Sequence, residues 1–197
     1  TPEHEGLLVA AATGFTSYAE MWVLRPATYL ERKDVQASRR GKLRAKALFL
    51  RARGYAGRAL ETRHPGIVDR LLRNPTEAVG DLRVDDLPAM YWFAAAHGRA
   101  ISTDPGDADL LVQGRTVSAL LDRGLVLDES WTRGDFHGVY IGIPGQLGGS
   151  PEKSEYHFRK AMEFNEGTSI GPLVTLAEVV HVQRQDRAAF TRTLRGA

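Results

Sequence analysis

The sequence contains no cysteine among its 197 residues. Disulfide bonds and thiolate zinc sites are therefore excluded, and the absence is compatible with either the cytoplasm or the periplasm. No glycine-rich segment has the P-loop or dinucleotide-binding pattern, and no serine stands in a nucleophile elbow. The six histidines also lack the paired spacing of a helical zinc site. We therefore predict a protein that is not an enzyme and holds no cofactor and no metal.

The sequence is also poor in net charge and in long hydrophobic runs. Its formal charge is only +2, so nothing in the overall balance predicts a nucleic-acid partner. The longest apolar run, residues 89–96, is too short to cross a bilayer. Basic residues nevertheless concentrate between Arg32 and Arg63. This pattern predicts a solvated basic helix face or, alternatively, a docking patch for an acidic partner that includes Arg39, Arg44 and Arg51.

Apolar residues recur at helical spacing along most of the chain, and no segment alternates as a strand would. The sequence therefore predicts an all-α protein. The first helix is expected to pack through Leu8, Ala11, Phe15, Tyr18, Ala19 and Trp22. The expected long helices cover residues 5–25, 33–63, 85–101, 110–127, 135–143, 151–166, 171–182 and 186–194, with short helices after Pro65 and Pro75.

The most informative segment is the end of the second helix, residues 51–66. Glycine lowers the stability of a helix but lets another backbone come close, so Gly54 and Gly57 predict such a close approach. They belong to a predicted apolar helix face that also contains Leu43, Ala47 and Leu50. The sequence His64-Pro65-Gly66 then predicts an abrupt stop.

Similar helix ends are expected further along the chain. They lie at Ala59-Leu60-Glu61, Gly124-Leu125-Val126, Ala161-Met162-Glu163 and Leu194. Their spacings are close to multiples of the roughly 34-residue tetratricopeptide period. We therefore predict one domain over residues 1–197, built of tetratricopeptide-like repeats stacked as antiparallel helix pairs.

Aromatic residues stand beside small residues on several predicted helix faces. For any one of them a place in the core is the simpler interpretation. Together they indicate an apolar channel or pocket between helices, because such a cavity needs bulky rings next to alanine and glycine. The adjacent acids Asp85 and Asp86 are expected to cap a helix rather than act as a catalytic pair. The predicted ligand-facing or pore-lining residues are Phe15, Tyr18, Trp22, Tyr55, Tyr91, Trp92, His137 and Tyr140.

Six segments carry a family resemblance, and they follow one another in order along nearly the whole chain. They cover residues 12–19, 51–66, 87–101, 127–137, 148–158 and 176–186. With these segments the chain resembles the T component of the tripartite ATP-independent periplasmic (TRAP) transporters, a family of helical tetratricopeptide-like proteins.

The resemblance implies a non-catalytic periplasmic lipoprotein that assembles as a homotrimer. It further implies binding to the solute-binding P component and an apolar pore for a hydrophobic or amphipathic small molecule. The chain departs from the family pattern in two places. These 197 residues lack the acylated N-terminal cysteine, so a lipid anchor is not part of them, and Gly142-Ile143-Pro144-Gly145 interrupts an expected helix.

Two other classes of function stay open at this point. A generic tetratricopeptide-like adaptor would bind acidic peptides through Arg39, Arg44 and Arg51. An enzyme would need His64, His97 or His137 to meet a carboxylate in a cleft.

Overall fold

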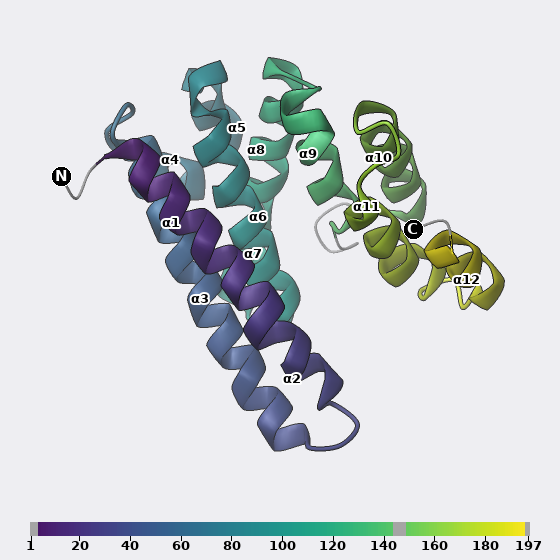
Figure 1. Ribbon diagram of the computed structural model, residues 1–197. Coiled ribbons are helices and arrows are strands. Elements are labelled where there is room, and N and C mark those ends of the chain that lie inside the picture. Colours follow the sequence, from purple (N-terminus) through teal and green to yellow (C-terminus); the bar gives the residue numbers. More distant parts are fainter. Residues whose placement is uncertain (1–3, 144–148, 196–197) are drawn as a thin grey trace. The chain divides into compact units, whose positions relative to one another are not determined.

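The computed structural model describes residues 4–143 and 149–195, and no strand occurs among them (Figure 1). This confirms the all-α prediction, while the tetratricopeptide-like repeat stays a prediction. Internal packing divides the chain into two compact units, Thr1–Arg123 and Gly124–Ala197. The prediction of a single domain stays open, and each unit is described by itself below.

The first unit contains a long helical hairpin followed by shorter helices. Its elements are α1 (Glu5–Tyr18), η1 (a π-helix, Ala19–Leu24), α2 (Arg25–Tyr29), α3 (Val35–Glu61), α4 (Ile67–Arg73), α5 (Pro75–Ala78), the 3-10 turns η2 (Val79–Asp81) and η3 (Val84–Asp86), α6 (Leu87–Thr103), α7 (Ala108–Val112) and α8 (Gly114–Leu127), whose last residues enter the second unit. The predicted helix over 110–127 is therefore two helices, divided at Gln113.

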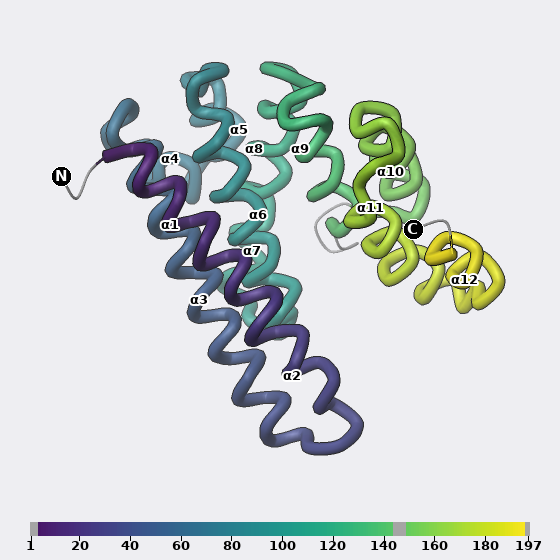
Figure 2. The backbone as a smooth tube through the Cα atoms, viewed as in Figure 1, coloured from purple at the N-terminus to yellow at the C-terminus, as the bar shows by residue number. Residues whose placement is uncertain are grey.

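The elements α1, η1 and α2 form one continuous helical rod that lies antiparallel to α3 (Figure 2). The rod packs against α3 and also contacts α6. Its buried residues are Leu8, Ala12, Thr16, Ala19, Val23, Leu24 and Ala27. The predicted buried face was partly wrong, because Tyr18 and Trp22 are exposed and only Leu8 and Ala19 of that set are fully buried.

The buried face of α3 also differs from the predicted stripe. Its buried residues are Ser38, Ala45, Phe49, Ala52, Ala56, Gly57, Ala59 and Leu60. Leu43, Ala47 and Gly54 face outward, and a Cβ added at Gly54 would meet nothing within 4 Å. Gly57 is closely approached, but by side chains rather than by another backbone: an added Cβ would lie 3.0 Å from Val68 and 3.3 Å from the Phe93 ring of α6.

The stop after α3 forms where the sequence predicts it. Gly66 adopts a left-handed conformation with φ of 79°, which glycine tolerates because it has no Cβ. The Glu61 carboxylate accepts hydrogen bonds from the backbone amides of Gly66 (2.5 Å) and Val68 (2.8 Å). Glu61 thereby satisfies amides at the start of α4 that have no partner within that helix.

Asp85 and Asp86 point in different directions at the start of α6, as expected for neighbours on a helix. Asp85 is exposed and lies 3.4 Å from Arg63. Asp86 is buried and accepts hydrogen bonds from the Arg83 backbone amide (2.8 Å) and from His64 Nε2 (2.9 Å). Asp86 thus caps the 3-10 turn η3 and makes no side-chain cap hydrogen bond to α6, so the predicted cap lies one turn earlier. Its contact with His64 also ties the α3 stop to the start of α6.

The second unit contains α9 (Trp131–Ile141), α10 (Pro151–Phe164), α11 (Ile170–Leu176), the π-helix η5 (Ala177–His181) and α12 (Arg187–Arg195). Within α9, Thr132, Arg133 and Gly134 have positive φ and are not helical, so the regular helix begins at Asp135 as predicted. Ser150 and Asp186 cap α10 and α12 as the sequence predicts. Pro144 and Gly145, which were expected to break a helix, lie outside the described residues.

The core of the second unit forms where α10 meets α9, α11 and η5. It contains Ile141, Ala161, Leu176 and Val180, with Phe158 packed against it. A further close contact joins the end of α8 to α9, since a Cβ at Gly124 would lie 2.3 Å from the Phe136 ring.

The four predicted helix ends are confirmed, because α3, α8, α10 and α12 end at Glu61, Leu127, Phe164 and Arg195.

One helical stretch, Glu5–Tyr29, is long and apolar enough by length and composition to cross a membrane. A search for uninterrupted apolar runs misses it, because Thr13, Thr16, Ser17 and Glu20 interrupt the pattern. A buried core helix passes the same criteria. The inner face of this rod packs in the first unit, while its outer face leaves several large apolar side chains exposed.

Two glycines of α3 provide a matched test of the hairpin packing. We expect Gly54→Ala to raise the free energy of unfolding by about 0.5–1 kcal/mol, because the site is open and alanine favours a helix. Gly41→Ala should lower it by about 1 kcal/mol or more, since the new Cβ would lie 2.5 Å from Ala27 Cβ. Urea unfolding measures both changes, and a stabilising Gly41→Ala would contradict the close approach of α2 to α3.

Candidate functional site

Aromatic and arginine side chains share the outer face of the hairpin in the first unit. We call this the aromatic–arginine face and define it by Phe15, Tyr18, Trp22, Arg44, Arg51 and Tyr55. The first three residues come from α1 and η1, and the others from α3. The rod and α3 bury their small residues against each other, so the larger residues are left on the outside.

Rings and guanidinium groups alternate across this face. The rings of Phe15 and Tyr55 stack with centroids 5.4 Å apart and an interplanar angle of 17°. The Arg51 guanidinium lies 5.6 Å from the centre of the Phe15 ring, within cation–π range. Arg44 Nη2 donates a hydrogen bond of 3.3 Å to the Tyr18 hydroxyl. These contacts hold the arginine side chains over the aromatic rings.

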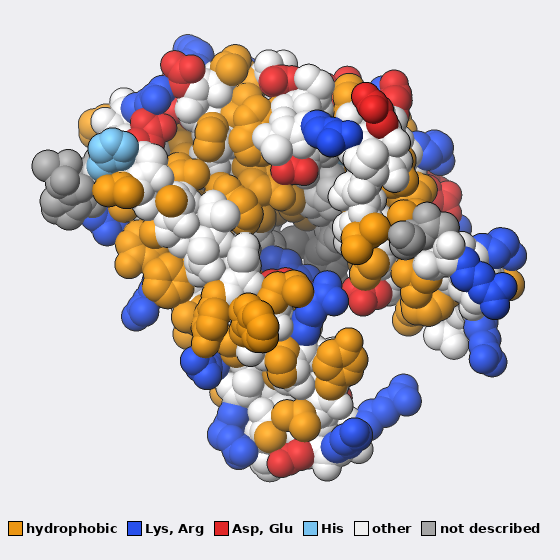
Figure 3. All heavy atoms as spheres, in the orientation of Figure 1, with side chains coloured by type: hydrophobic (Ala, Val, Ile, Leu, Met, Phe, Trp, Pro, Cys, Tyr) orange, Lys and Arg blue, Asp and Glu red, His pale blue; other side chains and the backbone are white. Residues whose placement is uncertain are grey.

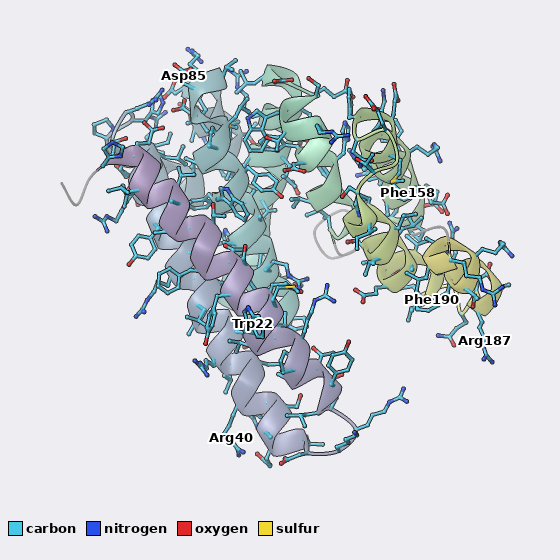
Figure 4. All side chains as sticks on the ribbon, viewed as in Figure 1. Trp22, Arg40, Asp85, Phe158, Arg187 and Phe190 are labelled. Carbon is cyan, nitrogen blue, oxygen red and sulfur yellow. The ribbon has the colours of Figure 1, made fainter. Side chains whose placement is uncertain are left out.

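The aromatic–arginine face stays largely open to solvent. Tyr18 is 44% exposed and Trp22 is 74% exposed. Figure 3 shows hydrophobic side chains along this hairpin, interspersed with Lys and Arg, and Figure 4 labels Trp22 on the rod. Exposed tryptophan, tyrosine and arginine are the residue types enriched at the energetic centres of protein interfaces. The arrangement is suited to binding a partner surface that is both apolar and acidic.

The predicted pair Tyr91 and Trp92 lies on α6, with the two rings edge to face at 5.0 Å. Both side chains are half-buried. They are thus on a different helix from the aromatic–arginine face.

A polar cluster lies inside the first unit, between α3 and α6. Arg53 Nη1 donates to Gln113 Oε1 (3.0 Å) and to His97 Nε2 (3.3 Å). Burial, together with a smaller effect of the nearby Arg53 charge, lowers the pKa of His97 to about 3, which favours the neutral ring. Burial also lowers the pKa of the Arg53 guanidinium. Because arginine only donates, His97 Nε2 is the acceptor and Nδ1 carries the proton.

The predicted residues His137 and Tyr140 belong to an aromatic cluster in the second unit. His137 is fully buried, and its Nδ1 lies 2.8 Å from Nδ1 of His157. The Tyr140 ring stacks on His157 at 4.2 Å, and the Phe164 ring stacks on His137 at 5.7 Å. The pKa of His157 is lowered to about 4, mainly by burial and to a smaller extent by the charge of the neighbouring His137. Burial also lowers the pKa of His137, and two neutral rings can share one N–H···N hydrogen bond.

Two surface hollows lie elsewhere. A groove of about 500 Å³ in the first unit is lined by Glu31, Val35, Ser38, Arg39, Lys42, Leu43, Thr103 and Asp104. A hollow of about 310 Å³ in the second unit is lined by Glu155, Phe158, Arg159, Leu176, His181, Ala189, Arg192 and Thr193. Of the predicted site residues only Arg39 lines either of them. The eight predicted aromatic and histidine residues therefore lie outside both.

Two histidines do meet carboxylates, as a catalytic site would require. His64 Nε2 lies 2.9 Å from Asp86, and His137 Nε2 lies 3.3 Å from Glu129 Oε1 without hydrogen-bond geometry. Neither pair lines the two hollows described above. Within residues 4–143 and 149–195 no group of three or more His, Asp or Glu side chains is placed to hold a metal ion. Each histidine thus has a nearby carboxylate, but neither of the two hollows offers a substrate cleft next to it.

Comparison with known proteins decides the family. The family model described as "TRAP transporter T-component" matches residues 1–197, which is the whole chain. The chain belongs to the TRAP transporter T-component family. This T-component is also 26% identical over 202 residues to an uncharacterized protein of Treponema pallidum (strain Nichols). The match covers 98% of this chain and 62% of that relative, so the chain spans less than two thirds of the relative's length.

Sequence reasoning missed several residues of the T-component's clusters. His157 and Phe164 complete the histidine cluster, and their seven-residue spacing places them on one face of α10. That spacing was a usable signal. Arg53, His97 and Gln113 are far apart in the sequence, and only the packing of α3 against α6 and the start of α8 brings them together.

The buried neutral His97 predicts sensitivity to acid. Its folded pKa is lowered below the ordinary value of 6.5, so the unfolded chain binds a proton that the folded chain does not. Stability attributable to His97 is therefore lost as the pH falls from 6.5 towards 3, by about 2–3 kcal/mol at pH 4.5. The variant His97→Gln, which cannot titrate, should have a smaller loss of stability between pH 7 and pH 4.5. Urea unfolding at the two pH values measures this.

The matched control is His4→Gln, at an exposed histidine. It should keep the wild-type dependence of stability on pH. An unchanged dependence in His97→Gln would show that His97 is not held neutral in the folded protein.

Proposed function

We propose that this T-component is a non-catalytic periplasmic accessory protein of a TRAP-type solute uptake system. In this role it binds the solute-binding P component and holds a hydrophobic or amphipathic small molecule. Family membership over the whole chain supports the system, and the exposed aromatic–arginine face supports the binding role. The observation that carries the proposal is the exposure of Trp22 and Tyr18 beside Arg44 on the outer face of the hairpin.

We propose that the P component docks on the aromatic–arginine face through Arg44 and Arg51, with Arg39 further along α3. All three arginines are exposed, and none forms an ion pair within the described residues. Their charges are thus available to an acidic partner. Because exposed arginines steer a partner and fix its orientation, reversing their charge should weaken the complex without unfolding the protein.

We further propose that the eight predicted residues face the small molecule. Phe15, Tyr18, Trp22 and Tyr55 lie on an open surface, so an apolar path along them would need a cover. A neighbouring subunit of a homotrimer or the P component itself would supply that cover. His137 and Tyr140 are in the second unit, and their proposed contact with a small molecule concerns that unit alone.

Mixing the purified T-component with the P component of the same system tests the partner. We expect Arg44→Glu/Arg51→Glu to weaken binding by about tenfold or more, because a loss of about 1.4 kcal/mol corresponds to a factor of ten. The control Arg187→Glu/Arg192→Glu changes the same charge at exposed residues of α12 and should bind as the wild type does. Isothermal titration calorimetry measures the affinities.

The outcome of this titration also separates the proposal from the alternative of a general peptide adaptor. An adaptor would bind unrelated acidic peptides as tightly as it binds the P component. No complex between the wild-type proteins at tens of micromolar would contradict the proposed partner.

Mass spectrometry of the purified protein under native conditions tests the small molecule. We expect bound apolar or amphipathic molecules in the wild type. The variant Tyr18→Ala/Trp22→Ala should lose most of this material, since it removes the two most exposed rings of the aromatic–arginine face. The control Val112→Ala shortens an exposed apolar side chain outside the eight proposed residues, and this variant should retain the bound molecules. Equal loads in all three proteins would exclude Tyr18 and Trp22 from the ligand path.

A further inference from the structure

The turn between α2 and α3 exposes large apolar side chains that the hairpin does not use for packing. Tyr29 is 76% exposed, Val35 is 68% exposed and Leu30 is 36% exposed. The two helices meet instead through Ala27 and Gly41, whose small size permits the close approach. We call residues 29–40 the hairpin tip. Its apolar side chains therefore project from the end of the first unit without a partner in that unit.

The hairpin tip is also strongly basic. Arg32, Lys33, Arg39 and Arg40 are exposed and form no ion pair among the described residues. The two acids of the turn are already engaged. The Glu31 carboxylate pairs with Lys42, and Asp34 caps α3 by accepting a hydrogen bond from the Ala37 amide at 2.9 Å. The tip therefore presents four unpaired positive charges around three exposed apolar side chains.

The position of the tip within the first unit leaves it accessible. Lys46 Nζ pairs with Asp104 Oδ2 at 2.8 Å, so the end of α6 lies beside Lys46. The helix α3 continues for eleven further residues to Val35, which corresponds to about 16 Å. Figure 4 labels Arg40 on this part of α3. Val35, Ser38 and Arg39 of the tip line one side of the groove of about 500 Å³ described above, while the turn that joins α2 to α3 lies at the end of the hairpin (Figure 2).

From these observations we infer that the hairpin tip binds the surface of a bilayer that contains anionic lipids. A tyrosine ring and aliphatic side chains bury favourably at the boundary between headgroups and acyl chains, while arginine and lysine reach the phosphates. Each basic residue near an anionic membrane surface contributes roughly a fivefold gain in binding. The exposed apolar side chains and the unpaired basic residues of the tip together match the acyl and phosphate layers of an anionic lipid surface.

Vesicle sedimentation tests this inference with the purified protein. The probes are vesicles of pure phosphatidylcholine and vesicles with about 30% phosphatidylglycerol, in about 0.1 M salt. We expect binding to the anionic vesicles and little binding to the neutral ones. Raising the salt to about 0.5 M should weaken the binding, because the Debye length shortens.

Three variants assign the binding to the tip. Arg32→Glu/Lys33→Glu should reduce binding to anionic vesicles by roughly 25-fold or more, from two residues at about fivefold each. Tyr29→Ser/Val35→Ser should also reduce it, by removing the apolar anchors while keeping the charge. Arg187→Glu/Arg192→Glu makes the same change of net charge in the second unit and should bind as the wild type does.

Circular dichroism and urea unfolding confirm that each variant is folded, which is expected for exposed side chains. The inference is overturned if the wild type binds neither type of vesicle or binds both equally. It is also overturned if both tip variants bind as the wild type does, or if the α12 variant loses as much binding as they do. If the Arg32→Glu/Lys33→Glu variant instead loses only P-component binding, the tip is a protein-docking surface and not a lipid-binding one.

Discussion

The close packing of small residues along α3 is the constraint on which the first unit depends. Ala45, Ala52 and Ala56 are fully buried, and Gly57 lies against the Phe93 ring. Small side chains let the backbones of the rod and α6 approach α3 closely, so many dispersion contacts form over a short distance. Among the large side chains of α3, the seams accommodate Phe49 and Leu60. The remaining aromatic side chains of the hairpin are displaced to its outer face.

That displacement links the packing to the proposed function. The aromatic rings of this face are Phe15, Tyr18, Trp22 and Tyr55. Their contact with water costs free energy, because apolar surface is more stable when it is buried. The arginines of α3 partly compensate by covering the rings and remaining hydrated. The face therefore has hydrated charged groups next to apolar area that a partner could cover.

The second unit depends on a different type of interior. It buries two histidines in contact with each other, and burial lowers the pKa of the His157 ring, which favours its neutral form. The Nδ1–Nδ1 contact between the two imidazoles forms only in a defined orientation of the rings, which favours one arrangement of α9 against α10. The first unit has a comparable constraint at Arg53, His97 and Gln113. In both units a few polar contacts specify the arrangement that apolar packing makes favourable.

The order of helices, their ends and their caps were determined by the sequence alone, because these depend on local effects. Proline and glycine at residues 65 and 66 end α3, while Ser150 and Asp186 begin the helices that follow them. The family could likewise be inferred from ordered local segments. Only the tertiary structure decided which face of each helix is buried. Alanine fits either a core or a surface, so Ala52 and Ala47 differ only in their neighbours. For the same reason the rings at Tyr18 and Trp22 were expected inside and lie outside.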